Sequence, residues 1–358
     1  MNRIAGTLPL IIVTAAVMLH DTPQAAAQNI RNERLKIIAD DGGQGDSFGH
    51  SVAISGPTAI VGAPEDNDNG SRSGSAYLFR VATGTQIAKL LPHDGVFNDA
   101  FGYSVAISGT TAIVGATRND GPGEPNSGSA YLFDIADPVN PVESAKLRAS
   151  DGKRSDNFGF SVAISESTAI VGAWLDDNLR GTDAGSAHLF DATSGKPLAS
   201  LFPSDRGGQQ RFGVSVAISG TNALVGVYQD DDNGVGSGSA YLYDLTAGRQ
   251  IAKLLPADGA GGDQFGWSVA INESIAIVGA WEDVVNGAET GSAYLFDAAV
   301  GSQIAKLLSD DGAEGDLFGT SVAIGRSTAL VGAMGDDDNG SVSGSAYLFD
   351  VTTGAQIA

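Results

Sequence analysis

Carboxylate side chains are the most abundant groups in this sequence that could bind a metal ion, and they gather in Asp- and Asn-rich stretches. The richest stretches cover residues 230–234 and 336–340, and both read Asp-Asp-Asp-Asn-Gly. Ca²⁺ takes about six to eight oxygen ligands, mostly from carboxylates and carbonyls. We therefore expect Ca²⁺ as a cofactor, and the candidate metal ligands are Asp66, Asp68, Asp230, Asp231, Asp232, Asp336, Asp337 and Asp338. Neither stretch has the alternating register of an EF-hand loop. The alternative is a set of solvated turns, in which Asp, Asn and Gly are favoured for backbone reasons.

Aromatic residues gather at two positions that otherwise vary along the chain. The dipeptides Phe-Gly and Gly-Ala recur, and the residue that follows each differs from one copy to the next. Trp and Tyr at such positions can stack on sugar rings or anchor a protein partner. The candidate ligand-binding residues are Tyr103, Trp174, Tyr228, Trp267 and Trp281. The alternative is that these side chains fill the spaces between neighbouring structural units.

Signals for catalysis are weak. Beyond the N-terminal segment the chain has three histidines, His50, His93 and His188, and none has the HExxH or HxxEH spacing of a zinc site. A G-x-S-x-G nucleophile elbow and a phosphate-binding P-loop are also missing. Acidic pairs could act in glycoside cleavage, but pairs are too common here to point to one. We expect that the protein is not an enzyme.

The composition excludes several classes of function. The 358 residues include 42 acidic and 20 basic side chains, which give a net charge of -22. This balance argues against nucleic-acid binding, which needs clustered Lys and Arg. The chain has no cysteine, so disulfide scaffolds and thiolate metal sites are ruled out. The 42% of hydrophobic residues are enough for a large core.

An internal repeat of about 53 residues predicts the fold. Its six copies begin near Phe48, Phe101, Phe158, Phe212, Phe265 and Phe318. Each copy contains four short runs rich in Val, Ile, Tyr and Phe that are bounded by turn residues, and none contains a long helical pattern. Four antiparallel strands per unit are typical of a β-propeller blade, whereas a parallel β-helix has a shorter period. We predict an all-β protein, a β-propeller of four-stranded antiparallel blades over residues 28–358.

The repeat resembles the FG-GAP repeat. Phe48-Gly49 followed by Gly62-Ala63-Pro64 carries the resemblance, which extends over residues 35–358. It implies a β-propeller like that of integrin α subunits and of exported bacterial FG-GAP proteins, and a role in cell-surface recognition. Integrin-type repeats carry an Asp-rich calcium loop between the two motifs. The corresponding residues 54–58 contain no carboxylate, so the calcium ligands of that family are not carried over.

The two ends of the repeat region suggest how the ring closes. Residues 34–38 align with the last strand of a repeat, so we expect them to complete the blade that begins at Phe318 and to close a ring of six. Residues 356–358 begin a further outer strand, which predicts a seventh blade if the chain is a fragment. Lysines on the outer strands fit as charges that protect sheet edges; they are Lys36, Lys89, Lys146, Lys253 and Lys306.

Residues 1–27 read as a signal peptide, cleaved after about Ala27, so we expect a secreted, periplasmic or cell-surface protein without a membrane span after cleavage. Alternate connections of a four-stranded meander emerge on one side, and 31 of the 42 acids fall in these connections. The sequence thus favours an exported, non-catalytic binding or adhesion module. Its acidic, aromatic-bearing face would recognise a glycan, a surface polymer or a protein. A polysaccharide hydrolase or lyase, and a structural repeat piece of a longer surface protein, are the alternatives.

Overall fold

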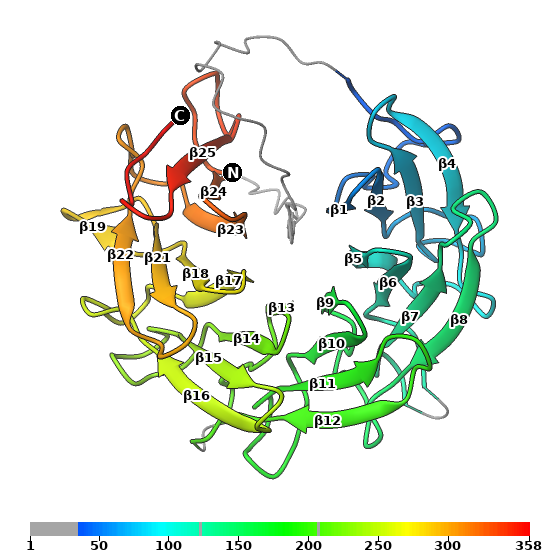
Figure 1. Ribbon diagram of the computed structural model, residues 1–358, viewed down its shortest axis with the longest axis horizontal. Coiled ribbons are helices and arrows are strands. Elements are labelled where there is room, and N and C mark those ends of the chain that lie inside the picture. The colour runs from blue at the N-terminus through cyan, green and yellow to red at the C-terminus, as the bar shows by residue number, and fades with distance from the viewer. Residues whose placement is uncertain (1–34, 122–123, 206–207) are drawn as a thin grey trace, which may run out of the picture.

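The strands form six antiparallel sheets that are arranged around a central axis as the blades of a β-propeller (Figure 1). The computed structural model describes residues 35–121, 124–205 and 208–358, and these residues contain no α-helix. Within each blade, sequence-adjacent strands pair from the axis outward. The predicted four-stranded meander is confirmed.

The strands fall into six blades, with an extra two-stranded hairpin in blade 5. Blades 1 and 2 consist of β1 (Ser51–Ser55), β2 (Thr58–Ala63), β3 (Ser75–Arg80) and β4 (Thr85–Leu90), then β5 (Phe101–Ser108), β6 (Thr111–Ala116), β7 (Ser129–Asp134) and β8 (Val142–Leu147). Blades 3 and 4 consist of β9 (Ser161–Ser165), β10 (Thr168–Ala173), β11 (Ser186–Asp191) and β12 (Pro197–Leu201), then β13 (Val216–Ser219), β14 (Asn222–Val227), β15 (Ser239–Asp244) and β16 (Arg249–Leu254). Blades 5 and 6 consist of β17 (Phe265–Ile271), β18 (Ile275–Ala280), β21 (Ser292–Asp297) and β22 (Gln303–Leu307), with the hairpin β19 (Val284–Val285) and β20 (Ala288–Glu289), then β23 (Phe318–Ile324), β24 (Thr328–Ala333) and β25 (Ser345–Asp350).

The repeated Phe-Gly and Gly-Ala motifs join one blade to the next. At the contact between blades 1 and 2, a Cβ atom on Gly62 would lie 2.0 Å from the carbonyl oxygen of Gly102. A Cβ atom on Gly102, whose φ is +89°, would lie 2.1 Å from the carbonyl oxygen of Ser75. The Ser51 hydroxyl donates a hydrogen bond to the Gly102 carbonyl at 2.9 Å, and the same Ser–Gly bond recurs at the four following blade contacts. Glycine is therefore required because two backbones meet there.

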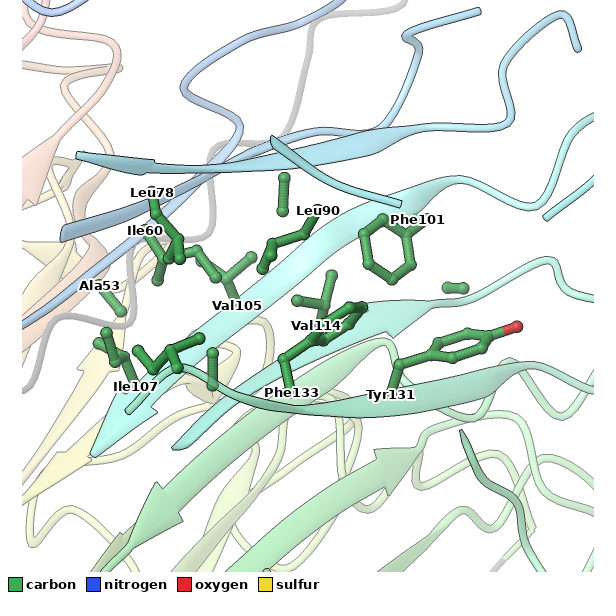
Figure 2. Packing of buried hydrophobic residues seen from close by; sticks show 14 residues of the cluster. Ala53, Ile60, Leu78, Leu90, Phe101, Val105, Ile107, Val114, Tyr131 and Phe133 are labelled. Carbon is green, nitrogen blue, oxygen red and sulfur yellow. The ribbon is translucent and has the colours of Figure 1, made fainter. Parts of the chain in front are cut away.

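The hydrophobic core lies between blades. Figure 2 shows the first of five such clusters, in which Ile60 and Leu78 of blade 1 pack against Phe101, Val105 and Phe133 of blade 2. Alternate residues of each strand point to opposite faces of its sheet, so blades 2 to 5 each contribute to two clusters, and blades 1 and 6 each contribute to one. Small and branched side chains of the six inner strands line the central channel.

The ends of the repeat region do not close the ring as the sequence suggested. Residues 355–358 run beside β25, where the amide of Ile357 donates to the carbonyl of Leu348 at 2.7 Å. The C-terminal residues thus take the fourth-strand place in blade 6. Residues 35–41 lie along blade 1 instead, and the amide of Asp40 donates to Gln86 at 2.9 Å. The expectation that residues 34–38 complete blade 6 is wrong, because its outer edge is already paired.

Blade 6 consequently keeps one face without a neighbouring blade in the described part of the chain, and Figure 1 shows the ring open between β25 and β1. Leu348 is 37% exposed, whereas Leu78 at the same place in blade 1 is 0% exposed. On the other side of the opening, Phe48 is half-buried, whereas its counterpart Phe101 is fully buried.

Candidate functional site

The aromatic residues singled out from the sequence come together on one rim of the propeller. Neighbouring ring centroids lie 4.7 to 6.4 Å apart in an unbroken series that crosses five blades. We call this series the aromatic arc; its members are His50, Tyr103, Phe160, Trp174, Tyr228, Trp267 and Trp281. All five candidate ligand-binding residues belong to it.

The strands place these rings at the rim through two local features. In blades 2 and 5 the strand pairing shifts between Phe101 and Ser104 and between Phe265 and Ser268. These irregularities place Tyr103 and Trp267 in two-residue insertions, and such bulges redirect side chains. Trp281 directly follows β18, as Trp174 follows β10. Both positions lie at the same end of a blade, where its first strand begins and its second strand ends. The rings from the two strands therefore gather there.

Burial divides the arc into two groups. Phe160 and Tyr228 are only 7% and 5% exposed, and they pack with Val214 in a small apolar cluster. Tyr228 is therefore a packing residue, and the expectation that it offers a free ring surface to a ligand is wrong. Tyr103, Trp174, Trp267 and Trp281 are half-buried and keep part of their surface open. Burial therefore supports the packing alternative for Phe160 and Tyr228, and ligand binding stays a prediction for the four half-buried residues.

The arc contains one guanidinium group. Arg211 lies 5.0 Å from the ring centroid of Trp174 and 5.5 Å from that of Tyr228, and it also donates to the Tyr228 hydroxyl. The Nε atoms of Arg211 and Trp174 have no hydrogen-bond partner among the described residues. Burial lowers the pKa of His50 to about 4, so its imidazole is neutral at pH 7. Arg211 therefore places a positive charge beside the rings of Trp174 and Tyr228.

Many acids on the same side of the propeller are internal hydrogen-bond acceptors. Ten aspartates are buried. Five of them lie two residues before a Phe-Gly motif and accept a hydrogen bond from a backbone amide three residues earlier; they are Asp46, Asp99, Asp156, Asp263 and Asp316. Neither metal binding nor plain solvation describes these five residues, because they hold the turn that leads into blades 1, 2, 3, 5 and 6.

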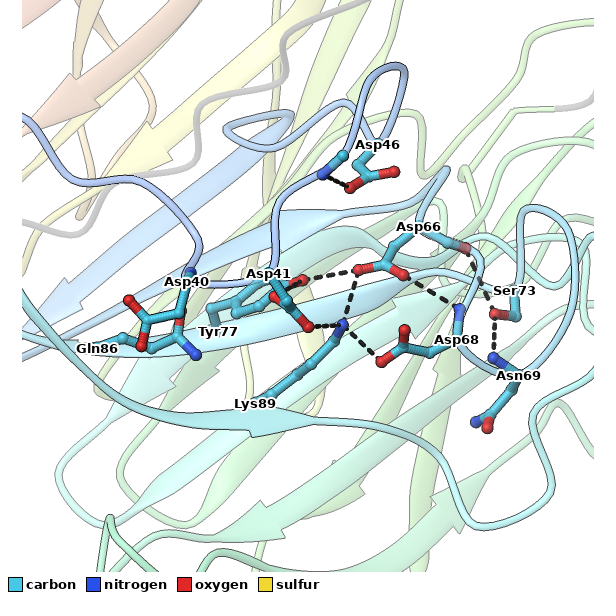
Figure 3. Close-up of polar contacts among 11 residues, drawn as sticks. Asp40, Asp41, Asp46, Asp66, Asp68, Asn69, Ser73, Tyr77, Gln86 and Lys89 are labelled. Carbon is cyan, nitrogen blue, oxygen red and sulfur yellow. Dashed lines mark hydrogen bonds and ion pairs between the residues drawn. The ribbon is translucent and has the colours of Figure 1, made fainter.

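The candidate metal ligands of blade 1 surround a lysine. The Nζ atom of Lys89 lies 2.7 Å from Asp41, 2.9 Å from Asp66 and 2.6 Å from Asp68, and Figure 3 shows these side chains around it. The hydroxyl of Tyr77 donates to Asp66 at 2.7 Å and to Asp41 at 3.0 Å. Although burial acts to raise it, the bonds from Tyr77 and Lys89 hold the pKa of Asp66 below its ordinary value.

The same arrangement recurs in blade 4, with three carboxylates close enough for one ion. Ligand oxygens of Asp205, Asp230 and Asp232 all lie within 4.8 Å of one another. The Nζ atom of Lys253 lies 2.5, 2.7 and 2.8 Å from these three side chains. The ammonium group takes the place that a metal ion would need, so this donor set fits a lysine better than Ca²⁺. Asp231 lies outside the group and accepts from the amide of Gly236.

Blade 6 differs because no lysine among the described residues reaches its acidic loop. Asp336 accepts from the hydroxyl of Tyr347 at 2.8 Å and from the amide of Asp338 at 3.1 Å. The charge of Asp336, with burial and further acids, raises the pKa of Asp338. Asp337 has no side-chain hydrogen bond within the described chain.

The sequence pattern alone does not identify the lysines as partners of the candidate metal ligands, and it misses one of the acids around each lysine. The sequence predicts that Lys89, Lys146, Lys253 and Lys306 protect outer edges, but their side chains are only 14 to 23% exposed and pair with aspartates. Asp41 and Asp205 were not candidates, because each lies 48 positions before its lysine. The signal that could have found them is the recurrence of that separation at Lys306 and Asp258.

Comparison with known protein families identifies the six repeats. The profile of the FG-GAP repeat family matches six segments, at residues 32–79, 85–133, 141–190, 197–243, 249–296 and 302–349. No curated protein matches the chain significantly. In the part of the chain that the structure describes, no helix is long and apolar enough to cross a membrane. The signal-peptide prediction falls on residues outside that part.

Proposed function

We propose that this chain, which belongs to the FG-GAP repeat family, is an exported, non-catalytic binding module whose aromatic arc recognises a glycan. The arc itself carries the proposal. Four half-buried rings from blades 2, 3 and 5 lie along one rim, and aromatic faces of this kind stack on the apolar faces of sugars. A glycan chain suits several half-buried rings spread along one rim better than a single protein anchor does.

Adhesion at a cell surface and the absence of catalysis are parts of this proposal. Export is supported by the signal-like pattern of residues 1–27. The non-catalytic part is supported by the histidines beyond the N-terminal segment, none of which has the HExxH or HxxEH spacing of a zinc site.

Calcium enters the proposal only at blade 6. Asp336 and Asp338 lack the ammonium group that Asp66 and Asp230 have, and the mutual repulsion of acids favours a bound cation there. Thermal unfolding in excess Ca²⁺ and in EDTA, with Mg²⁺ as a control, tests this part. A Ca²⁺-specific rise that disappears in Asp336→Asn supports it, and identical curves overturn it.

Intrinsic fluorescence tests the glycan site directly. The chain has three tryptophans, and all three belong to the arc. Titration with oligosaccharides from a panel of surface polysaccharides is expected to shift the emission. Trp267→Ala and Trp281→Ala are expected to weaken binding at least tenfold. Phe97→Ala is the matched control, because Phe97 is 70% exposed and lies outside the arc.

Two results would contradict the proposal in different ways. Unchanged binding in both tryptophan variants would remove the arc as the glycan site. Release of new reducing ends from a bound polysaccharide would overturn the non-catalytic part and favour the hydrolase alternative.

A further inference from the structure

In blades 1, 2 and 5, three polar side chains of the two outer strands contact the chain segment that leads into the blade. In blade 5, Gln303 accepts from the amide of Ala257 at 2.9 Å, and Tyr294 donates to Asp258 at 3.1 Å. Lys306 pairs with the same Asp258 at 2.7 Å. Blades 1 and 2 have the equivalent contacts. We call this set the outer contact of a blade.

Blade 3 has lost all three side chains. The strand register places His188 opposite Ser200, as it places Tyr241 opposite Lys253 in blade 4. Pro197 stands where blade 4 has Gln250. The imidazole of His188 forms its two hydrogen bonds within its own blade, with Ser186 and Ser200 at 2.9 Å each. The outer contact between blades 2 and 3 is therefore missing.

A cavity of about 130 Å³ lies where those side chains are lost. Arg148 and Ser150, which follow β8 of blade 2, line it on one side, and His188 and Ser200 line it on the other. The smaller side chains of blade 3 account for this space, because a lysine lies over a tyrosine ring at the same place in blades 1, 2, 4 and 5. The cavity corresponds in position to a lysine side chain.

The acids that accompany such a lysine are still present in blade 3. Asp151 and Asp176 correspond to Asp258 and Asp283 of blade 5, which both pair with Lys306. Asp176 is only 3% exposed, and its side-chain partner is the amide of Asn178 at 3.3 Å. Within the described chain, no lysine or arginine nitrogen lies within 4.0 Å of either carboxylate. A buried carboxylate without a cation is costly.

The neighbouring cationic side chains are engaged elsewhere. The guanidinium Nε of Arg148 donates to the Ser129 hydroxyl at 3.3 Å, and the ammonium group of Lys153 donates to the carbonyl of Asp177. Burial, together with the charge of Asp176, raises the pKa of Asp156 to about 7. An added positive charge near Asp176 would therefore be favourable.

We propose that the cavity between blades 2 and 3 binds a small primary alkylammonium ion, whose chain lies between His188 and Ser150 and whose ammonium group pairs with Asp151 and Asp176. The bound amine then occupies the position of the lysine side chain of the other blades. This site is separate from the aromatic arc.

Calorimetric titration with n-butylammonium tests the proposal, with n-butanol and tetramethylammonium as control ligands. Binding by the wild-type protein is expected to be at least tenfold tighter than binding of either control. Ser200→Lys supplies the missing ammonium group from within and is expected to abolish binding. Lys253→Ser is expected to create a second site in blade 4.

Equal binding by the wild-type protein and Ser200→Lys would overturn the proposal, as would equal binding of tetramethylammonium. Asp176→Asn is expected to weaken binding at least tenfold. If that variant fails to fold, Ser200→Lys alone decides, because it adds the side chain that four other blades already accommodate.

Discussion

Replacing Lys253 by methionine tests whether the ammonium groups of the propeller are structural. The lysine side chain is 14% exposed, and its partner Asp230 is 1% exposed. Methionine keeps most of the apolar stem but leaves the buried carboxylate without a cation. Removing one partner of a buried pair costs about 3–5 kcal/mol. We expect the lower end, about 3 kcal/mol, because Asp205 and Asp232 are 36% and 49% exposed and remain hydrated.

The expected shift of the unfolding midpoint follows from the size of the chain. An unfolding entropy of about 2.1 cal/mol/K per residue gives about 0.7 kcal/mol/K over about 320 residues. A loss of about 3 kcal/mol therefore lowers the midpoint by about 4 °C. Differential scanning calorimetry at pH 7 measures this shift, and Lys196→Met is the matched control because Lys196 is exposed on a turn.

Acid pH provides an independent check of the sign. Although burial acts to raise it, the bonds from Lys253 and Tyr241 hold the pKa of Asp205 below its ordinary value. A lowered carboxylate pKa contributes stability that is present above the unfolded-state pKa and is lost as the pH falls. The difference in unfolding midpoint between the wild-type protein and Lys253→Met should therefore become smaller below about pH 4.

Ca²⁺ bound in blade 4 should stabilise Lys253→Met but not the wild-type protein. With the ammonium group gone, the three carboxylates around it meet the oxygen preference of Ca²⁺. An excess of about 100 times the dissociation constant would restore about 2.7 kcal/mol to the variant only. A midpoint of Lys253→Met within about 1 °C of wild type at pH 7, against the expected lowering of about 4 °C, would refute the reasoning.

Three further predictions concern the blade contacts and the arc. Gly102→Ala should abolish cooperative folding or lower the unfolding midpoint by more than about 4 °C in calorimetry, because its Cβ atom would meet the Ser75 carbonyl. Gly109→Ala should cost only about 1 kcal/mol of stability, since no atom lies within 4 Å of the added Cβ atom. In chemical denaturation, Leu78→Ala should lower the free energy of unfolding by about 2–5 kcal/mol and Leu348→Ala by less than about 1 kcal/mol, because only the former opens a cavity between blades. Equal losses would show that the exposed face of blade 6 is covered in solution. His50 is buried with its pKa lowered to about 4, so protons bind preferentially to the unfolded chain, and stability should fall by about 3 kcal/mol between about pH 6.5 and 4. His50→Phe should flatten that part of the curve of unfolding midpoint against pH. An unchanged slope in the variant would contradict the lowered pKa of His50.

The blades could be predicted from the sequence because their determinants repeat. Each contact between blades uses the same glycines and the same serine, so the Phe-Gly and Gly-Ala motifs record tertiary contacts as a local pattern. The aromatic rim could be predicted for the same reason, since its residues occupy fixed places in that pattern.

The closure of the ring could not be predicted from the pattern. Residues 35–38 and residues 355–358 both have the sequence of an outer strand, and either could pair with β25. The nearer segment wins in the structure, because a short turn joins it to β25 and little loop entropy is lost. The pattern gives the type of a strand but not the choice between two equivalent segments.

The role of the acids was hidden by sequence distance. Asp205, Asp230 and Lys253 come from three separate segments, and the burial that makes the lysine structural depends on the tyrosine beneath it. Residue type alone cannot separate a carboxylate that awaits a metal ion from one that already has a cation. Blade 3 shows the reverse case, since two acids remain there after the lysine has been replaced by Ser200.

The contrast between invariant contacts and a variable rim bears on how the propeller could acquire a ligand. A change at Gly62 or Ser51 would disturb two backbones at once, so those positions are fixed in every blade. The rim position after Phe-Gly instead holds Tyr103 in blade 2, Trp267 in blade 5 and Thr320 in blade 6. In blades 2 and 5 the bulge directs this side chain to the rim, where it stays half-buried, whereas Phe160, Val214 and Thr320 at the same position are buried. On the proposed function, recognition can therefore change at the half-buried positions while the glycines and serines of the blade contacts stay the same.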